Sequence, residues 1–244
     1  MTKALASDID GTLIFKGQFK VSDMNFIRKY RKSGYLFGLC TGRPLKEITE
    51  ILPSDIQPDF YIATSGAVIL NKEKHVIYEK IICFEDIHKI YKEYHQKALI
   101  IIQTDTDVYK TAYEEYDKDI KIIRSLDDIK DKKIYGISLV FETEEQAKTI
   151  CYHINQNYHS LEGFQNTNSI DIVKKGCSKG YGILKVKELL NIDDMSGIGD
   201  SYNDIPMLDV VDCSFTFKNS PLMIQQQVSY VVDSVAEAIS ILMK

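Results

Sequence analysis

The sequence predicts an α/β fold, a doubly wound parallel sheet with a smaller α+β domain inserted into it. Short apolar runs alternate with helical stretches of about ten residues in both outer parts of the chain, which is typical of a parallel sheet covered on both faces. The alternation changes in the middle of the chain. Polar motifs follow the predicted strands, and ligands of such sheets bind at the strands' carboxyl ends. The 244 residues suffice for one large domain or for a core with an insert.

The first part of the chain alternates strand and helix. Phe26, Ile27 and Tyr30 share one helical face, Pro44 suits the first position of a helix, and Asn71–Lys74 forms a polar hairpin turn. We therefore expect strands at 3–7, 35–40 and 60–64, helices at 24–32 and 44–52, and a hairpin of 67–70 with 75–78.

The middle of the chain has a different pattern. We expect a helix at 85–96, strands at 99–104 and 134–141, and then a helix whose opening residues, Thr143–Gln146, have the spacing of a capping box. The charged segment Asp127–Lys133 is expected to be a solvated loop or the start of a helix. Residues 80–173 are therefore predicted to form the inserted α+β domain, and residues 1–79 and 174–244 the core domain.

The regular alternation resumes after Gly176. The expected elements are helices at 179–190, 204–210, 221–228 and from 235 onward, with strands at 195–198, 213–217 and 230–232.

Composition restricts the possible partners and location. Thirty-five acidic against thirty basic residues give a net charge of −5, so no electrostatic footprint for nucleic acid or anionic lipid is present. The longest purely apolar stretch, Ala98–Ile102, is far shorter than the roughly 20 residues that a bilayer span requires. Without a leader pattern, the expected location is the cytosol. Five scattered cysteines indicate neither a disulfide framework nor a zinc knuckle. Partners are expected to be small molecules, and the oligomeric state is left open.

Three polar motifs follow predicted strands: Asp8–Thr12, Thr41–Arg43 and Gly199–Asp204. Carboxylates gathered at one sheet edge repel each other by about 4 kcal/mol for a pair at 4 Å in an effective dielectric near 20. A bound cation relieves this repulsion. An all-oxygen donor set favours Mg²⁺, which also bridges to phosphate.

Other residues of these motifs suit a phosphate group. Thr41 is expected at the amino end of a helix, where backbone N–H groups favour an anion. Lys179 adds a positive charge and Asn203 a hydrogen-bond donor. Uncatalysed phosphate-monoester hydrolysis is so slow that enhancements approach about 10²¹-fold, and a carboxylate nucleophile divides the barrier into two steps. Asp8, which ends the first strand, is the expected nucleophile, and Asp10, beyond the turn at Gly11, the general acid and base, with a backbone carbonyl that could bind the metal.

Four motifs of the chain resemble, in type and order, those of the haloacid dehalogenase superfamily. They are D-x-D-G-T, T-G-R, the lysine of S-K-G, and G-D-S-x-x-N-D. The separations are 33 residues from Asp8 to Thr41, 138 from Thr41 to Lys179 and 21 from Lys179 to Asp200. The second separation leaves room for an insert between the second and third motifs. The chain is more narrowly similar to the Cof-type phosphatases, whose Rossmann-like core carries a large α/β cap of the C2 (IIB-like) kind.

The resemblance implies roles at the matching positions. Asp8 would be nucleophile and metal ligand, Asp10 acid/base with a place at the metal, and Asp200 a metal ligand, with Asp204 supporting the metal shell. The implied phosphate-binding residues are Thr41, Lys179, Gly42, Arg43 and Asn203. This chain has Ser65-Gly66 where relatives often have Asn-Gly, and 217–220 only partly resembles the usual Gly-Asn-Ala, which leaves substrate contacts there open.

The expected function is that of a Mg²⁺-dependent phosphatase acting on a small phosphorylated metabolite through an aspartyl-phosphate. By family analogy, the expected substrates are sugar phosphates, flavin precursors or pyridoxal phosphate. One alternative is a phosphomutase of the same superfamily, and another is a receiver-like or binding module without turnover. In the insert, the side chains that could line a substrate face are Tyr109, Tyr113, Tyr116, Asn166 and Asn168, although packing is the favoured interpretation for each.

Overall fold

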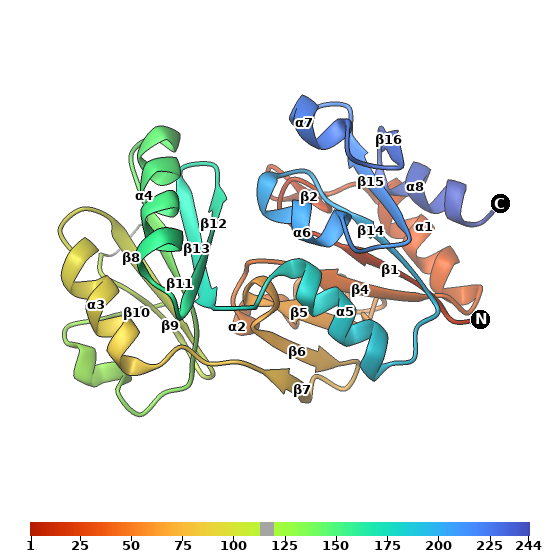
Figure 1. Ribbon diagram of the computed structural model, residues 1–244. Coiled ribbons are helices and arrows are strands. Elements are labelled where there is room, and N and C mark those ends of the chain that lie inside the picture. Colours follow the sequence, from red (N-terminus) through yellow and green to blue (C-terminus); the bar gives the residue numbers. More distant parts are fainter. Residues whose placement is uncertain (113–119) are drawn as a thin grey trace.

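The structure, a computed structural model that describes residues 1–112 and 120–244, is built on two sheets (Figure 1). The described strands of the larger sheet lie in the order β16-β15-β14-β1-β4-β5-β6-β7, and those of the smaller sheet in the order β10-β9-β8-β11-β13-β12. A short hairpin of β2 (Ile14–Phe15) and β3 (Gln18–Phe19) stands apart from both. We call the part built on the larger sheet the core and the part built on the smaller sheet the cap.

The larger sheet is parallel from β16 to β5 and antiparallel at the edge formed by β6 and β7. The prediction of a parallel sheet is therefore correct except at that edge, where the short turns of the predicted hairpin require antiparallel neighbours. Its strands are β1 (Lys3–Ser7), β4 (Leu36–Cys40), β5 (Phe60–Ala63), β6 (Val68–Asn71), β7 (Val76–Glu79), β14 (Asp194–Ile198), β15 (Cys213–Phe217) and β16 (Tyr230–Val232).

Helices cover both faces of the larger sheet because its strands are apolar on both sides. On β1, Leu5 packs on one face and Ala4 and Ala6 on the other. One face is covered by α1 (Val21–Lys32), α2 (Leu45–Ile48) and α8 (Val235–Leu242), and the other by α5 (Lys179–Leu189), α6 (Ile205–Leu208) and α7 (Leu222–Gln225). This is the doubly wound arrangement that the alternation of elements predicts.

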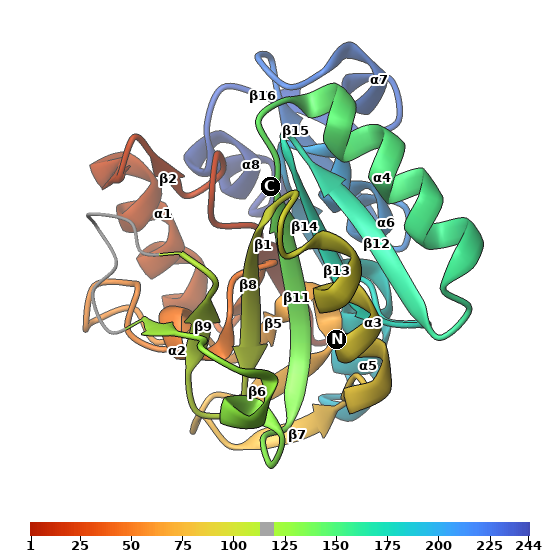
Figure 2. The same cartoon turned by 90° about the vertical axis from the view of Figure 1, so that its left-hand side faces the viewer.

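The cap sheet is covered by helices on one face only (Figures 1 and 2). Its strands are β8 (Leu99–Thr104), β9 (Val108–Lys110), β10 (Lys121–Ile122), β11 (Ile134–Val140), β12 (Leu161–Asn166) and β13 (Ser169–Lys174), and its helices α3 (Phe84–Tyr94) and α4 (Glu144–Asn157). Alternate residues of the central strands, including Ile102, Ile137 and Ile172, pack beneath these helices. The opposite face is turned toward the core.

Several elements differ from the sequence-based expectation. The hairpin of β12 and β13 was not predicted, because Glu162, Gly163 and Gln165 have weak strand propensity and the pairing with β11 decides the conformation. The helix expected at 44–52 begins at Leu45 and ends at Ile48, with Thr49 as its C-cap. Pro53 accounts only for the absence of helix at the residue before it. The helices expected at 204–210 and 221–228 shorten to α6 and α7.

Other local signals gave correct predictions. The capping box of α4 is formed, with Thr143 Oγ1 accepting from the Gln146 N–H at 3.3 Å and Gln146 Oε1 accepting from the Thr143 N–H at 3.2 Å. The charged stretch after Ser125 contains a 3₁₀-helix, Leu126–Ile129. In the described ranges, no helix combines the length and the apolar character needed to cross a bilayer.

The uncovered cap face lies against the carboxyl ends of the core strands, and polar contacts bridge the two parts. Lys46 Nζ lies 3.4 Å from Asp107 Oδ1, and the Tyr135 hydroxyl donates to Glu79 Oε2 at 2.6 Å. Gln103 Nε2 of the cap donates to the Gly42 carbonyl of the core at 3.3 Å. The cap is therefore closed over the core in this structure. The insert boundaries at residues 80 and 173 stay a prediction.

The first turn of α5 is packed so closely against the core that it has no room for a side chain at Gly180. A Cβ there would lie 2.0 Å from the Pro206 carbonyl oxygen. We predict that Gly180→Ala lowers the free energy of unfolding by about 2–3 kcal/mol through overpacking, measured by urea unfolding. Gly17→Ala is the control, because its positive φ of 75° costs about 1 kcal/mol of strain and its surroundings are open. Equal losses in both variants would contradict the packing argument.

Candidate active site

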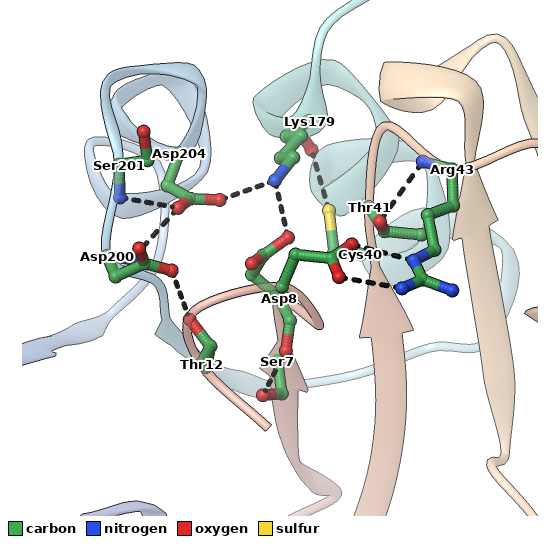
Figure 3. Close-up of polar contacts among 11 residues, drawn as sticks. Ser7, Asp8, Thr12, Cys40, Thr41, Arg43, Lys179, Asp200, Ser201 and Asp204 are labelled. Carbon is green, nitrogen blue, oxygen red and sulfur yellow. Dashed lines mark hydrogen bonds and ion pairs between the residues drawn. The ribbon is translucent and has the colours of Figure 1, made fainter. Parts of the chain in front are cut away.

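The candidate active site lies where β14, β1 and β4 end side by side (Figure 3). Asp8 follows β1, Thr41 follows β4, and Asp200 lies two residues after β14. Since parallel neighbours end at the same edge of a sheet, these three residues are brought together by the strand order alone. Lys179 begins α5 and reaches the same edge from the helix layer.

Lys179 is the centre of the site. Its side chain is 1% exposed, and Nζ lies 2.7 Å from Asp8 Oδ1 and 2.5 Å from Asp204 Oδ1. Ser178 caps α5 by accepting a hydrogen bond from the Tyr181 N–H, and Gly180 allows the close contact with Pro206 that sets the helix position. A buried ammonium group is stable only when paired, so Lys179 fixes both carboxylates.

Asp204 organises the loop that carries Asp200. Its Oδ2 accepts hydrogen bonds from the backbone N–H groups of Asp200 at 2.9 Å and Ser201 at 3.0 Å. Thr12 Oγ1 donates to Asp200 Oδ1 at 2.7 Å. Asp200 Oδ2 lies 2.3 Å from where a Cβ on Gly11 would stand, so the absence of a side chain there makes the close approach possible, and the φ of +82° independently favours glycine. Sequence reasoning missed the positioning role of Thr12, although the residue lies in the first motif.

The pKa values show that the cluster carries excess negative charge. Burial, followed by repulsion from Asp204, raises the pKa of Asp8 well above its usual value despite the nearby Lys179. The same two causes raise the pKa of Asp200 to about 6. Burial lowers the pKa of Lys179, but Asp204 and Asp8 outweigh that effect and raise it overall, so the ammonium group stays charged.

The donor set fits a hard divalent cation. Among the described residues, carboxylate oxygens of Asp8, Asp200 and Asp204 lie within 4.8 Å of one another. Asp204 already accepts hydrogen bonds from Lys179 and from two backbone N–H groups. In contrast, Asp8 Oδ2 and Asp200 Oδ2 accept no hydrogen bond from the part of the chain described. The two unused oxygens suit direct ligation and Asp204 suits support, since Mg²⁺ binds through one or two carboxylates, water and phosphate.

Asp10 lies apart from this carboxylate cluster. Its exposed side chain forms a two-pronged ion pair with Arg43, with Nε to Oδ2 and Nη2 to Oδ1 both at 2.7 Å. The carboxylate of Asp10 is therefore not among the clustered metal-ligand candidates, and metal binding by its backbone carbonyl stays a prediction. The pairing leaves the Asp10 carboxyl free of the metal position, as proton transfer requires.

Thr41 differs from expectation in its surroundings. Helix α2 begins only at Leu45, so Thr41 lies in the loop before it. The Thr41 N–H donates to the Ile62 carbonyl at 2.9 Å, and Oγ1 accepts from the Arg43 N–H at 3.1 Å. The prediction that Thr41 offers helix-terminal N–H groups is wrong, because the chain turns into a loop before Pro44. Its hydroxyl remains the group suited to an anion.

A cavity of about 470 Å³ joins this edge to the cap. Its lining includes the predicted residues Asp8, Asp10, Thr41, Gly42, Arg43, Asp200 and Asn203, together with the cap residues Ile101, Gln103, Val108, Lys110, Ser138, Asn166 and Asp171. Two residues essential to the geometry, the acidic Asp204 and its basic partner Lys179, are not part of this lining and are buried behind it. The cavity has room for a phosphate group and a small attached group.

Of the cap side chains considered from sequence, Asn166 lines the cavity, Tyr109 packs inside the cap, and Asn168 donates to the Phe141 carbonyl. Tyr113 and Tyr116 lie outside the described residues. Gln103, Ser138 and Asp171 were missed. The alternation in Ser169–Val173 was the available signal, since its aspartate is the polar residue between two isoleucines.

Ser65, the residue that stands where relatives often have asparagine, is buried and has a φ of 48° and ψ of 39°. This left-handed conformation is one that asparagine adopts more readily than serine. Ser65 Oγ has no hydrogen-bond partner in the described chain. It does not line the cavity, so the departure changes the support of the site rather than its surface.

Comparison with known proteins points to one family of hydrolases. The profile of the haloacid dehalogenase-like hydrolases matches residues 5–242. A "putative phosphatase" of Buchnera aphidicola is 30% identical, with 91% of this chain and 88% of the relative covered. A 5-amino-6-(5-phospho-D-ribitylamino)uracil phosphatase of Bacillus subtilis is 24% identical, covering 95% and 90%, and phosphoglycolate phosphatase 2 of Saccharolobus solfataricus is 26% identical, covering 94% and 85%.

Solved structures have the same fold. A haloacid dehalogenase-like hydrolase from B. subtilis superposes with a TM-score of 0.87 at 19% identity, covering 98% of each chain. A subclass IIB sugar phosphatase superposes with a TM-score of 0.83 at 23% identity, covering 99% of each. The Rossmann-like core and its cap are therefore the fold that the sequence motifs led us to expect.

The raised pKa of Asp200 predicts a pH dependence of stability in the metal-free protein. The folded state holds the Asp200 proton up to about pH 6, whereas an unfolded aspartate loses it near 3.8. The stability that this group contributes is thus complete below pH 3.8 and is lost as the pH rises through about 6. With EDTA present, we predict that raising the pH from 5 to 7.5 lowers the free energy of unfolding by on the order of 1–2 kcal/mol through the ionisation of Asp200.

Asp200→Asn tests this prediction, because the amide oxygen can still accept from Thr12 but the group cannot ionise. Urea unfolding with EDTA should show a smaller loss of stability between pH 5 and 7.5 in the variant than in the parent. Added Mg²⁺ should stabilise the parent at pH 7.5 and have little effect on the variant. The same pH dependence in both proteins would exclude Asp200 as its source.

Proposed function

The chain belongs to the haloacid dehalogenase-like hydrolases, and from this membership we propose that it is a Mg²⁺-dependent phosphatase that hydrolyses a small phosphorylated metabolite through an aspartyl-phosphate. The observation that carries the proposal is the buried contact of Lys179 with Asp8 and Asp204 at the wall of a cavity shared by core and cap. A nucleophile held by a cation, beside two further carboxylates, is suited to phosphoryl transfer.

Asp8 would act as the nucleophile. Lys179 holds Oδ1, and one carboxylate oxygen would attack phosphorus while the other would remain for the metal. As the bond from the Asp8 oxygen to phosphorus forms, the bond from phosphorus to the leaving oxygen breaks. Water then attacks the phosphorus of the acyl phosphate, which releases inorganic phosphate and restores the Asp8 carboxylate.

Asp10 would supply the proton to the leaving oxygen and later take a proton from the attacking water. In this structure its carboxylate is paired with Arg43, and this ion pair lines the same cavity as Asp8. The Arg43 guanidinium can also bind phosphate, because its planar N–H groups match the oxygens of an anion. Transfer of Arg43 from Asp10 to the substrate would free the acid when the phosphate arrives.

Asp8 and Asp200 would hold Mg²⁺, with Asp204 fixing the Asp200 loop. The bound ion would neutralise charge on the phosphoryl oxygens and on the carboxylates around it. Lys179 would orient Asp8 and favour its ionised form, and Thr41 and Asn203 line the cavity where the phosphate would lie.

The closed cap would exclude bulk water during phosphoryl transfer, the usual use of such a lid. Names of relatives include both a ribitylamino-uracil phosphate and phosphoglycolate as substrates, so family membership supports a small phosphomonoester without selecting one. A sugar phosphate or related metabolite is our proposal for the class. The cytosol is the proposed compartment, since the five cysteines are free thiols and that compartment keeps thiols reduced.

The nucleophile is tested by Asp8→Asn. We predict phosphate release from p-nitrophenyl phosphate with Mg²⁺, lowered at least about 10³-fold in this variant because the amide cannot form the acyl phosphate. Chelation by EDTA should abolish release by the parent enzyme. The control is Asp131→Asn, the same change at an exposed position in the cap. Undiminished release by Asp8→Asn would assign the nucleophile elsewhere, and an isomerised sugar phosphate without free phosphate would indicate a mutase.

The proton-transfer role is tested by Asp10→Asn. We predict that turnover falls by about 10²- to 10⁴-fold, the usual contribution of a positioned acid/base. The nitrophenolate leaving group needs little protonation, so Asp8 should still be phosphorylated and the acyl phosphate should accumulate for lack of a base. Mass spectrometry of the quenched variant would detect the adduct. An unchanged rate would rule out Asp10 as the acid/base.

A further inference from the structure

Three polar side chains lie side by side on the cap face that is turned toward the core. They are Gln103 on β8, Ser138 on β11 and Asp171 on β13, and we call them the polar strip. Ser138 stands opposite Asp171 in the register of β11 and β13, and Gln103 stands opposite Gly136. Their sequence neighbours pack into the cap interior, so the alternation of the strands places the polar strip at the cavity.

The donors of the polar strip are already used. Ser138 Oγ donates to Asp171 Oδ1 at 2.8 Å, and Gln103 Nε2 donates to Ser138 Oγ at 3.4 Å and to the Gly42 carbonyl at 3.3 Å. Gln103 is only 4% exposed, and its Oε1 has no hydrogen-bond partner among the described residues. Within the same set of residues, nothing donates to Asp171 Oδ2. Both residues line the cavity, so two acceptors without donors stand at its wall, with Gln103 Oε1 closed off from solvent.

The polar strip lies close to the predicted phosphate site. Asp171 Oδ2 stands 2.6 Å from the position that a Cβ on Gly42 would occupy, in the turn that follows Thr41. Gln103, Ser138, Asp171 and Asp8 all line one cavity. A small leaving group attached to a phosphate at Asp8 would therefore extend into the same cavity that the polar strip lines.

We infer that Asp171 and Gln103 determine specificity by accepting hydrogen bonds from hydroxyl groups of the leaving group, so that the enzyme prefers an uncharged polyol phosphate. This inference rests on the proposed phosphatase function. Hydroxyl groups supply the donors that the two acceptors lack. A leaving group with a carboxylate or a second phosphate supplies none and is repelled by the Asp171 carboxylate.

The cations of the cavity do not reverse this preference. Arg43 is paired with Asp10 and lies 3.9 Å from Glu47, and Lys110 has an interaction of its own. The acidic residues lining the cavity are Asp8, Asp10, Glu47, Asp171 and Asp200, so they outnumber these two cations. Of these acids, Asp171 is the one that the cap contributes.

The test compares kcat/KM for ribitol 5-phosphate, an uncharged polyol ester, with that for 2-phosphoglycolate, a carboxylate ester. We expect the parent to prefer the polyol ester by at least about 100-fold, because buried acceptors without donors strongly disfavour the wrong substrate. Asp171→Asn should reduce this preference by at least about 10-fold, since the amide does not repel a carboxylate. The ratio of the kcat/KM values for the two substrates, measured in one preparation, does not depend on the fraction of enzyme that is folded.

Two further variants complete the experiment. Gln103→Leu removes the unpaired acceptor at similar volume and should also reduce the preference, by about 10-fold. Asp131→Asn, at an exposed cap position away from the cavity, should keep the ratio of the parent.

The outcomes separate the specificity inference from the proposed function. If the parent prefers 2-phosphoglycolate, or if both polar-strip variants keep the parent's ratio, the inference is overturned while the phosphatase assignment stands. If no phosphate is released from either ester or from p-nitrophenyl phosphate, the proposed function fails and the inference fails with it.

Discussion

The buried ion pairs of Lys179 are the interaction on which the rest of the site depends. They connect the first turn of α5 to the end of β1 and to the loop after β14, which are far apart in sequence. A lysine that is 1% exposed cannot lose one of its partners without leaving an uncompensated charge in the interior. The three segments must therefore assemble together, and that requirement fixes Asp8 and Asp204 relative to each other.

This arrangement stores electrostatic free energy. Three carboxylates face a single ammonium group, and the raised pKa values of Asp8 and Asp200 express the imbalance. An excess of negative charge favours the binding of a divalent cation, and under the proposed function the cation and the substrate phosphate would complete the charge balance. Outside the cluster, the pairing of Asp10 with Arg43 holds a further carboxyl apart from the three clustered carboxylates.

Core and cap divide the chemistry between them. Every residue proposed for phosphoryl transfer comes from the core, at sheet ends or helix starts whose positions are set by backbone pairing. The cap contributes the polar strip, which forms no hydrogen bond with Lys179 or its partners among the described residues. Under the proposed function, such a division would allow one reaction to serve different leaving groups, in keeping with relatives that are named for chemically different substrates.

The sequence alone predicted the doubly wound core, the inserted α+β domain and the motif residues that line or support the cavity, because hydrophobic alternation and motif order are local properties of the chain. The sequence-based prediction failed where tertiary contacts such as strand pairing, rather than local propensity, decide the conformation. The hairpin of β12 and β13 has weak local propensity, and α2 begins only at Leu45, which leaves Thr41 outside the helix terminus. Only the tertiary structure could show that Arg43 binds Asp10, that Thr12 orients Asp200, and that Gln103, Ser138 and Asp171 form one strip. Each of these contacts joins residues from separate segments, and their distances depend on how the strands and the two domains pack.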